Sequence, residues 1–482
     1  MKKLLYILLP LLLTACDNML EEVPKSFVSR ANYYQSEEDA QGAINGAYAA
    51  LGPDLFGIDY YLLIELHGDF LNGRGSQAPI SNFDRVLDQG NINRAATGWS
   101  RIYTAINRAN AVLENVALIP EMNENVRTRI LAEAHFLRAF CYFDLVRGWG
   151  AVPLRTTEVR DLSQLAGERA PEAEVYKLIV DDLVAAEAGL PLTVGAETGR
   201  ASVWAAKMLL AHVYLTTGKY AEAAAKANEV INSGNFALIE VDQPDDFYKI
   251  FAAESHSEEI FAVKHSANRQ SSLPTYLHMG NSRPYNYKSG GNYAWLPDMS
   301  TWLADWDNSD LRRDFNLYTH ILDANDNWVP LPVTVPILFK KYITNADALA
   351  IYPAPMYRYA EALLFYAEAS ARAEESVSDL ALERLNMIKR RAYGYDPDVA
   401  SPVDYPAGMS LDDFLEAVAQ ERAYEFIIER RRFYDLKRTG KVKEAFAAAG
   451  KVFIDERMFF PIPEDEINNN PALSQEDQNP GY

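Results

Sequence analysis

Apolar side chains recur every three or four residues through long stretches of this 482-residue chain, which is the spacing that one face of an α-helix requires. In one such stretch Ala40, Ile44, Ala47 and Leu51 fall on the same face. The pattern predicts helices over 38–51, 98–116, 123–148 and 176–189. A chain of this kind packs the apolar faces of its helices together, so we expect a mostly α architecture.

Two further stretches are predicted to form antiparallel helix pairs. Residues 204–217 and 220–232 flank a break at Gly218 and Lys219, and residues 357–373 and 379–392 form a second pair. In the first pair Tyr214, Ala223 and Ala227 alternate large and small side chains as in a tetratricopeptide repeat. Such repeats bury their faces only against neighbours, so we expect the pairs to stack into one scaffold.

The predicted body is closed by one long helix over 411–439. Ser410, with Asp413 three residues later, is a helix-start signal, and Gly440 is a stop signal.

Helical periodicity weakens over 54–97 and again over about 233–350. In the second region Gly, Pro, Asn and aromatic residues increase, and only 259–264 and 333–341 resemble short strands. Long irregular stretches inside a compact domain usually carry function. We therefore expect a single domain over 30–482, in which a loop-rich insert at about 233–350, with a few short strands, carries the binding face.

The first 15 residues have the pattern of a bacterial lipoprotein signal peptide. Lys2 and Lys3 precede an apolar run of about ten residues, which is too short to span a bilayer. Small residues then lead to Cys16, whose sulfur would take the lipid; the alternative is an ordinary secretory signal followed by a chance cysteine. We expect a lipidated flexible tether over 16–29 and stable anchoring through more than one acyl chain.

The tether is acidic at Asp17, Glu21 and Glu22. Acidic residues just past the lipid site resemble the surface-export signal of Bacteroidota lipoproteins, which would place the body outside the cell. They would equally suit a solvated tether. No other segment is apolar for about eighteen residues, so we expect nothing else to span a membrane.

Composition excludes several classes of function. The formal charge of −21 becomes −23 once Lys2 and Lys3 leave with the signal, which argues against nucleic acids and other polyanions as partners. The remaining Cys141 lies on an apolar stripe, so we expect a buried structural thiol. No zinc motif, phosphate-binding loop or nucleophile elbow is present, so we expect no metal, no cofactor and no catalytic residues. A glycosidase carboxylate pair stays open because acidic residues are so numerous.

Segment 421–438 combines many charges with many apolar residues. Glu425 and Glu429 are four residues apart and share a helix face, with Arg422 and Arg432 a turn away. This cluster is either an anion or acid–base site, or a buried network of ion pairs. We favour the network, because a helix of this composition must bury charges and buried charges must be paired.

Several segments together resemble one family. These segments are GWSRIYTAINRANAVLENV (98–116), RAFCYFDLVRGWGAVPL (138–154), MYRYAEALLFYAEA (356–369), LNMIKRRA (385–392), ERAYEFIIERRRFYDLKRTG (421–440) and FFPIPEDEINNNPALSQEDQNPGY (459–482). In this order they resemble the signature blocks of the SusD/RagB family.

The resemblance implies a surface-exposed lipoprotein of the Bacteroidota outer membrane that captures nutrients without catalysing a reaction. Such proteins act as a lid on a SusC-like TonB-dependent transporter and bind oligosaccharides or, in some cases, peptides. The resemblance also implies helix pairs with a loop-built binding face. Two other functions stay open, a helical scaffold that binds only proteins and a surface glycosidase.

The family has no fixed ligand-binding motif, so ligand residues are predicted from composition. The insert holds four of the seven Trp residues, at 295, 302, 306 and 328, and Tyr276 lies nearby. Sugar rings stack on aromatic planes while polar side chains hold the hydroxyls. The first candidates are Tyr285, Tyr287, Tyr293 and Trp295, and the second group is Asp69, Asn72 and Arg74. The alternatives are core packing for the aromatic residues, which we favour for Trp302 and Trp306 on a short helix, and turn stabilisation for the polar ones.

Overall fold

The computed structural model describes residues 33–52, 58–252, 255–297, 301–343 and 350–482. The predicted signal peptide, Cys16 and the tether up to residue 29 lie outside these residues. Within the described part of the chain, no helix combines the length and the apolar character needed to cross a membrane.

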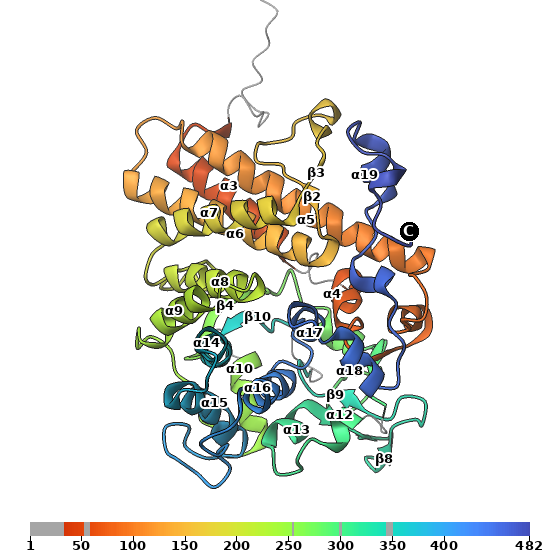
Figure 1. The fold of residues 1–482 in the computed structure, drawn as a ribbon. Helices are drawn as coiled ribbons and strands as arrows, with labels where there is room; N and C mark the ends of the chain where they lie inside the picture. The colour runs from red at the N-terminus through yellow and green to blue at the C-terminus, as the bar shows by residue number, and fades with distance from the viewer. Residues whose placement is uncertain (1–32, 53–57, 253–254, 298–300, 344–349) are drawn as a thin grey trace, which may run out of the picture.

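Four long helices form the upper layer in Figure 1. They are α3 (Glu37–Ala50), α5 (Gln89–Val116), α6 (Glu124–Trp149) and α7 (Glu172–Gly189). Ser36 begins α3 with a capping box, in which the Ser36 hydroxyl accepts the Asp39 N–H and the Asp39 carboxylate accepts the Ser36 N–H. The thiol of Cys141 is buried on α6, as the sequence predicts. The four predicted helices are thus confirmed, with α5 and α7 beginning earlier than expected.

The predicted helix pairs are confirmed as α8 (Val203–Thr216) with α9 (Tyr220–Ile231), and α14 (Tyr359–Glu374) with α15 (Asp379–Ala392). Helix α14 packs against α9, so the two pairs are neighbours although they are far apart in sequence. Ala223 and Ala227 are fully buried on α9, which allows this close approach. The pairs stack into one scaffold with the upper layer through contacts of α7 with α8.

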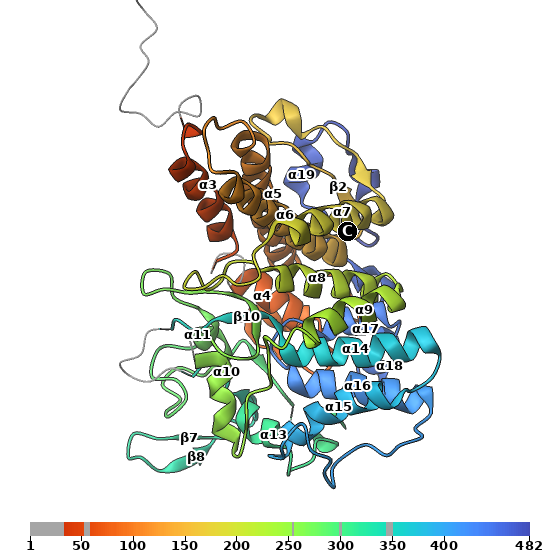
Figure 2. The same ribbon diagram turned by 90° about the vertical axis from the view of Figure 1, so that its left-hand side faces the viewer.

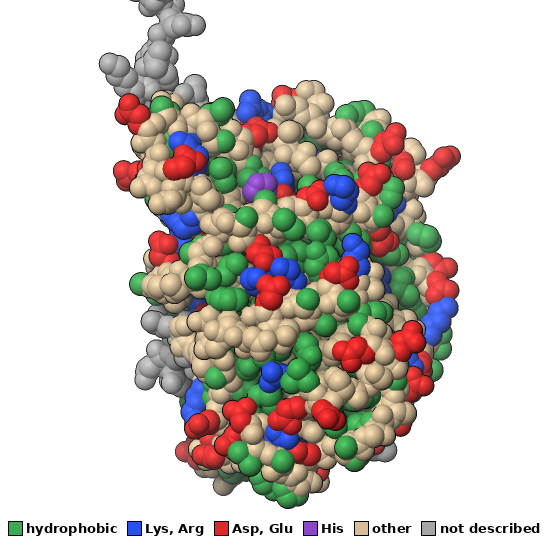
Figure 3. Space-filling view, turned by 60° about the vertical axis from the view of Figure 1, so that its left-hand side comes forward, with side chains coloured by type: hydrophobic (Ala, Val, Ile, Leu, Met, Phe, Trp, Pro, Cys, Tyr) green, Lys and Arg blue, Asp and Glu red, His purple; other side chains and the backbone are tan. Residues whose placement is uncertain are grey.

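Several charges on the surface of these helices are balanced by neighbours. Figure 3 shows acidic and basic side chains lying side by side on this face. Lys207 on α8 contacts Glu187 of α7 and Glu229 of α9, and Lys226 also contacts Glu187 at 2.8 Å. These ion pairs join three successive helices.

The prediction of one helix over 411–439 is wrong, because the chain turns between α16 (Leu411–Glu425) and α17 (Arg432–Arg438). Ile428 and Arg430 adopt φ angles of 58° and 61°, which end a right-handed helix. Buried side chains hold this turn. The Tyr61 hydroxyl donates to the Ile428 carbonyl at 2.5 Å, and the Arg430 N–H donates to the Glu65 carboxylate. Tertiary hydrogen bonds therefore replace the helical ones.

The prediction that 54–97 is irregular is wrong in part. This stretch contains α4 (Ile58–Glu65) and the first turns of α5. Tyr60, Leu62 and Leu63 are all fully buried, so α4 is surrounded by protein on several sides. A helix buried on all sides has no polar face, and therefore no periodic pattern to detect. Helix α5 begins at Gln89 because the Asp88 side chain accepts the Asn91 N–H at 3.0 Å.

The insert forms a loop-rich belt on one side of the molecule, on the side of α10, α11, β7 and β8 in Figure 2, away from the helix pairs. Its helices are η4 (Pro244–Phe247), α10 (Tyr248–Ala252), α11 (Leu273–Leu277), α12 (Thr301–Ala304) and α13 (Leu311–Asn316). Its strands are β4 (Glu259–Val263), β5 (Ala294–Trp295), β6 (Leu317–Tyr318), β7 (His320–Leu322), β8 (Trp328–Pro330) and β9 (Leu338–Phe339).

The strands pair only as antiparallel two-stranded ladders in the described part of the chain. The predicted strand 259–264 is confirmed as β4, which pairs with β10 (Ala354–Arg358). The predicted strand 333–341 shrinks to β9, which pairs with β6. The other ladders are β7 with β8, β1 (Asn72–Gly73) with β5, and β2 (Val152–Pro153) with β3 (Arg169–Ala170).

The C-terminal segment runs back along the molecule to the upper layer, where α19 lies near α5 (Figure 1). Its helices are α18 (Val442–Ala448), η5 (Asp455–Met458), α19 (Glu464–Asn469) and η6 (Gln475–Asp477). The remaining short helices are η2 (Gly75–Ile80) and η3 (Leu162–Leu165). The indole of Trp149 donates to the Pro461 carbonyl at 3.0 Å, which fastens this segment to α6.

Candidate functional site

Members of both groups of predicted ligand residues meet in the ladder of β1 and β5. Asn72 is opposite Trp295 and Gly73 is opposite Ala294. The next residue, Arg74, donates its backbone N–H to the Tyr293 carbonyl at 3.0 Å. Alternate residues of a strand point to the same side, so Asn72, Arg74, Tyr293 and Trp295 share one face of this ladder. We call these four residues the ladder face.

The opposite side of the ladder is packed against the protein. Ala294 is fully buried, and Gly73 lies directly over the first turn of η2. A Cβ atom at Gly73 would lie 2.3 Å from the backbone oxygen of Gln77. Only glycine therefore lets β1 lie this close to η2, and this contact fixes the orientation of the ladder face.

Tyr293 is held between a glycine and a second tyrosine. A Cβ atom at Gly291 would lie 2.5 Å from the ring of Tyr293, so the Gly291 backbone covers that ring closely. The ring of Tyr276 stacks on Tyr293, with centroids 5.9 Å apart and planes 20° apart. Tyr276 is half-buried at the outside of this stack. It belongs to the site through this stacking, which no pattern in the sequence predicts.

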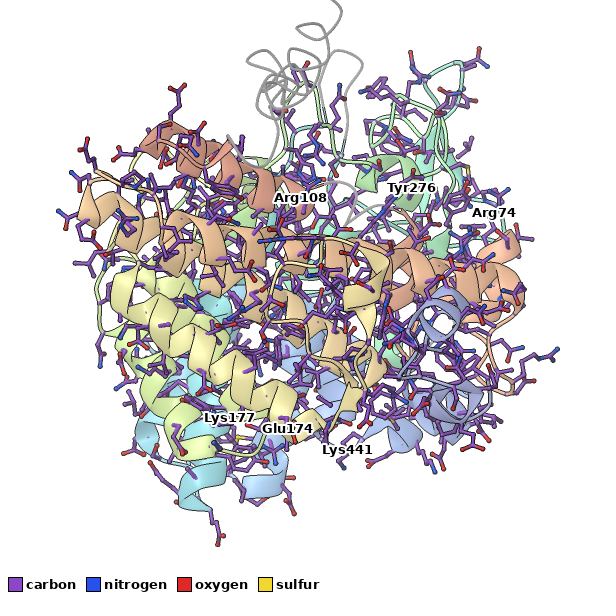
Figure 4. The ribbon with its side chains drawn as sticks, turned by 90° about the horizontal axis from the view of Figure 1, so that it is seen from above. Arg74, Arg108, Glu174, Lys177, Tyr276 and Lys441 are labelled. Carbon is purple, nitrogen blue, oxygen red and sulfur yellow. The ribbon has the colours of Figure 1, made fainter. Side chains whose placement is uncertain are left out.

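The Arg74 side chain is exposed but fixed in place. Its Nη1 donates to the Gly291 carbonyl and to Oδ1 of Asn292, both at 2.9 Å. Figure 4 shows Arg74 and Tyr276 on the same side of the molecule, next to the loop-rich belt. A fixed guanidinium beside stacked rings can donate hydrogen bonds to a ligand that lies on the rings.

Tyr285 and Trp295 pack against a small second core formed by Tyr318, Leu331, Val335 and Leu338. The ring of Tyr285 lies 4.4 Å from that of Tyr318 and 6.4 Å from that of Trp328. Both residues therefore support the belt as well as bordering the site. Tyr287 and Trp328 are 36% and 55% exposed, which leaves much of each ring available to a ligand.

The structure places Asp69 away from the ladder face. Its carboxylate accepts from Nε and Nη2 of Arg432 at 2.8 and 2.7 Å, and it is 5% exposed. Asp69 lines a cavity of about 320 Å³ along α16, α17 and α18. Of the second group of candidates, only Asn72 and Arg74 thus come together with the aromatic residues.

Trp306 has a packing role. It is 2% exposed, and its ring stacks on Tyr424 with centroids 4.4 Å apart and planes 5° apart. Its indole N–H donates to Asp310 at 3.0 Å. Trp302 lies on α12, the short helix that the sequence predicts. The packing interpretation of Trp306 is confirmed.

The charged cluster of 421–438 is a buried ion-pair network, as favoured from the sequence. Arg358 contacts Glu258, Glu425 and Glu429, and Arg391 contacts Glu258 and Glu425. Burial alone would raise the pKa of Glu425, but Arg391, Arg358 and Arg312 lower it well below its usual range. Glu425 and Glu429 are therefore held as ion-paired carboxylates away from solvent, which does not suit an acid–base pair.

No group of three or more His, Cys, Asp or Glu side chains among the described residues is arranged to hold a metal ion. The side chains that the ladder face gathers are an amide, a guanidinium and aromatic rings. This set can hydrogen-bond to hydroxyl groups and stack on sugar rings.

Two family models match the chain. The model described as the SusD family matches residues 340–482, and the model described as starch-binding associating with outer membrane matches residues 30–215. A SusD-like protein of Formosa agariphila, SusD-like protein P2, is 30% identical over 518 residues, covering 100% of this chain and 99% of that protein.

Solved structures share the fold. A SusD homologue of Bacteroides thetaiotaomicron superposes with a TM-score of 0.78 at 23% identity and covers 94% of this chain and 98% of its own. A laminarin-binding SusD-like protein has a TM-score of 0.75 at 24% identity, covering 93% of this chain and 100% of its own. Surface glycan-binding protein A of Bacteroides fluxus has a TM-score of 0.74 at 24% identity, with the same coverage. The relative that matches over its whole length, together with the two family models, shows that this chain belongs to the SusD/RagB family.

Proposed function

We propose that this protein is a lipid-anchored surface protein that binds oligosaccharides and passes them to a SusC-like TonB-dependent transporter in the outer membrane. The observation that carries the proposal is the ladder face, where two segments distant in sequence bring Asn72, Arg74 and Tyr293 together beside Tyr276. Family relatives described as laminarin-binding and glycan-binding support a carbohydrate ligand.

In this proposal the sugar ring lies over the outer face of Tyr276, while Asn72 and Arg74 hydrogen-bond to its hydroxyls. Asn72 can both donate and accept hydrogen bonds, as a hydroxyl group requires. Tyr287 and Trp328 extend the surface for further sugar residues. No bond is broken in the ligand, and the protein is a binding subunit rather than an enzyme.

The binding step is tested with the mature chain purified in detergent, on an array of oligosaccharides and peptides. We expect binding to at least one oligosaccharide, and a Tyr276→Ala variant that binds it about tenfold more weakly, which corresponds to about 1.4 kcal/mol. The matched control is Tyr395→Ala, because Tyr395 is 43% exposed and follows α15 on the helical side. If only peptides bind, the ligand class in the proposal changes from oligosaccharide to peptide. An array without any bound ligand would contradict the proposal.

The anchor and the transporter are tested in cells. A Cys16→Ala variant should lose palmitate labelling and leave the membrane fraction, while its purified form keeps oligosaccharide affinity. Cross-linking of the native protein should recover a TonB-dependent transporter. Membrane retention of the Cys16→Ala variant would contradict lipid anchoring, and the absence of a transporter among the cross-linked proteins would contradict delivery.

A further inference from the structure

The two segments that build the candidate site contain no acidic residue. Residues 70–83 and 260–297 lack Asp and Glu, although the whole chain holds 67 of them in 482 residues. At that frequency the two segments together would contain about seven. They do contain basic residues, which are Arg74, Lys264, Arg269, Arg283 and Lys288. These two segments are therefore basic, on a strongly acidic protein.

Arg74 on the ladder face and Lys288 on the neighbouring loop have no carboxylate partner among the described residues. Arg74 uses only Nη1, and its acceptors are the neutral oxygens of Gly291 and Asn292. Lys288 lies on the same loop, where its carbonyl accepts the Asn281 N–H at 3.0 Å, and its side chain is half-buried. Arg283 differs, because it pairs with Asp326 at 2.8 Å.

The remaining donors of Arg74 suit an anion. Nε and Nη2 of a guanidinium form a planar fork that matches the two oxygens of a carboxylate or a sulfate group. Because Nη1 is already bound to the loop, the fork is fixed before a ligand arrives. A neutral hydroxyl group would use only one of these donors.

We propose that the oligosaccharide bound here is anionic, with uronate carboxylates or sulfate esters that contact Arg74 and Lys288 while a sugar ring stacks on Tyr276. This inference rests on the proposed function and adds the chemical class of the ligand. It revises the expectation from the net charge of −21, since a ligand in contact with the site is governed by the nearest charges. Carboxylate and sulfate share the required chemistry, and the experiment separates them.

The test uses the mature chain in detergent and oligosaccharides of equal length from four sources. Laminarin and agarose supply neutral probes, carrageenan supplies sulfated probes, and polygalacturonate supplies uronate probes. We expect a sulfated or a uronate probe to bind at least tenfold more tightly than both neutral probes in 50 mM NaCl. This advantage should fall in 500 mM NaCl, because salt screens exposed charges.

Single substitutions then identify the cations. Arg74→Ala and Lys288→Ala should each weaken binding of the anionic probe about fivefold, and weaken any binding of the neutral probes by a smaller factor. The matched controls are Lys177→Ala and Lys441→Ala, which remove the same charge on the opposite side of the view in Figure 4. There Lys177 pairs with Asp181 at 2.6 Å and Lys441 pairs with Glu444 at 2.7 Å.

The outcomes separate this inference from the proposed function. The anionic ligand is overturned if neutral probes bind as tightly as the anionic ones or more tightly. It is also overturned if neither Arg74→Ala nor Lys288→Ala weakens binding of the anionic probe. Both results leave oligosaccharide binding in place. A broad array on which no oligosaccharide binds overturns the proposed function itself. A sulfated probe that binds where the uronate probe does not assigns sulfate, and the reverse assigns carboxylate.

Discussion

The buried ion-pair network and the ladder face use charged residues in opposite ways. In the network Arg358, Glu425 and Glu429 are nearly inaccessible to solvent, and each contacts at least two partners of opposite charge. On the ladder face Arg74 is exposed and bonded only to neutral oxygens of the protein. The same residue type thus stabilises the fold in one region and remains available to a ligand in the other. A charged residue indicates a binding site only where the protein supplies no partner of opposite charge.

The largest expected effect is at the core network. Glu425→Gln removes the charge that Arg358 and Arg391 share, and leaves buried guanidinium groups without their partner. Breaking a buried ion pair costs about 3–5 kcal/mol, so the free energy of unfolding should fall by that amount. Urea denaturation measures it, with Lys177→Ala as the surface control. A loss below about 1 kcal/mol would contradict a structural role for the network.

A second prediction concerns how the free energy of unfolding depends on pH through buried Glu65. Burial raises the pKa of Glu65 from 4.5 to about 7. Because the folded-state pKa is the higher one, this group stabilises the fold fully below pH 4.5 and loses its contribution as the pH rises to about 7. Glu65→Gln keeps an oxygen for the Arg430 N–H and has no such loss.

The Glu65→Gln variant should therefore gain up to about 3 kcal/mol over the wild-type protein between pH 4.5 and pH 8. Denaturation at both pH values measures this difference. The control is Glu222→Gln at an exposed position on α9, which should show no such trend. A difference that stays constant with pH would contradict a raised pKa.

Gly73→Ala tests the packing behind the ladder face. The added Cβ would clash with the Gln77 backbone, so β1 must shift, and such overpacking typically costs about 1–3 kcal/mol. We expect weaker oligosaccharide binding together with this loss of stability. Gly46→Ala is the matched control, since no atom lies within 4 Å of its added Cβ and Ala favours the helix. Unchanged oligosaccharide binding in Gly73→Ala would show that the position of β1 does not affect the ligand site.

The smallest effect on stability is expected at Arg74. Because its side chain is exposed and carries no ion pair within the described residues, Arg74→Ala should change the free energy of unfolding by less than about 0.5 kcal/mol. Thermal denaturation next to Glu425→Gln makes the comparison direct. A loss as large as that of Glu425→Gln would mean that the ladder face and the buried network use their charges alike.

The sequence predicts those parts of the fold whose pattern is local. Ala223, Ala227 and the break at Gly218 define a helix pair without reference to the rest of the chain. Helix α4 was missed because its apolar residues surround the helix and leave no period. The turn at Ile428 and Arg430 was missed because it depends on Tyr61 and Glu65, which are distant in sequence.

The sequence predicts individual residues of the site but not how they are arranged in space. Asn72, Arg74, Tyr293 and Trp295 were chosen from local composition, and the structure brings them together. The pairing of two strands of two residues each leaves no signal in the sequence, so neither their meeting nor the separation of Asp69 could be predicted. Tyr276 joins the site only because α11 places its ring on Tyr293.

The ladder of β1 and β5 has a consequence for how such proteins diversify. The two-residue pairing of β1 with β5 orients the face, and the buried network that maintains the body lies elsewhere. Exchanges at exposed positions within 276–295, such as Tyr287, can therefore accumulate over generations without loss of the scaffold. Selection could then change the ligand through substitutions in a short loop, while the rest of the gene keeps encoding the same fold.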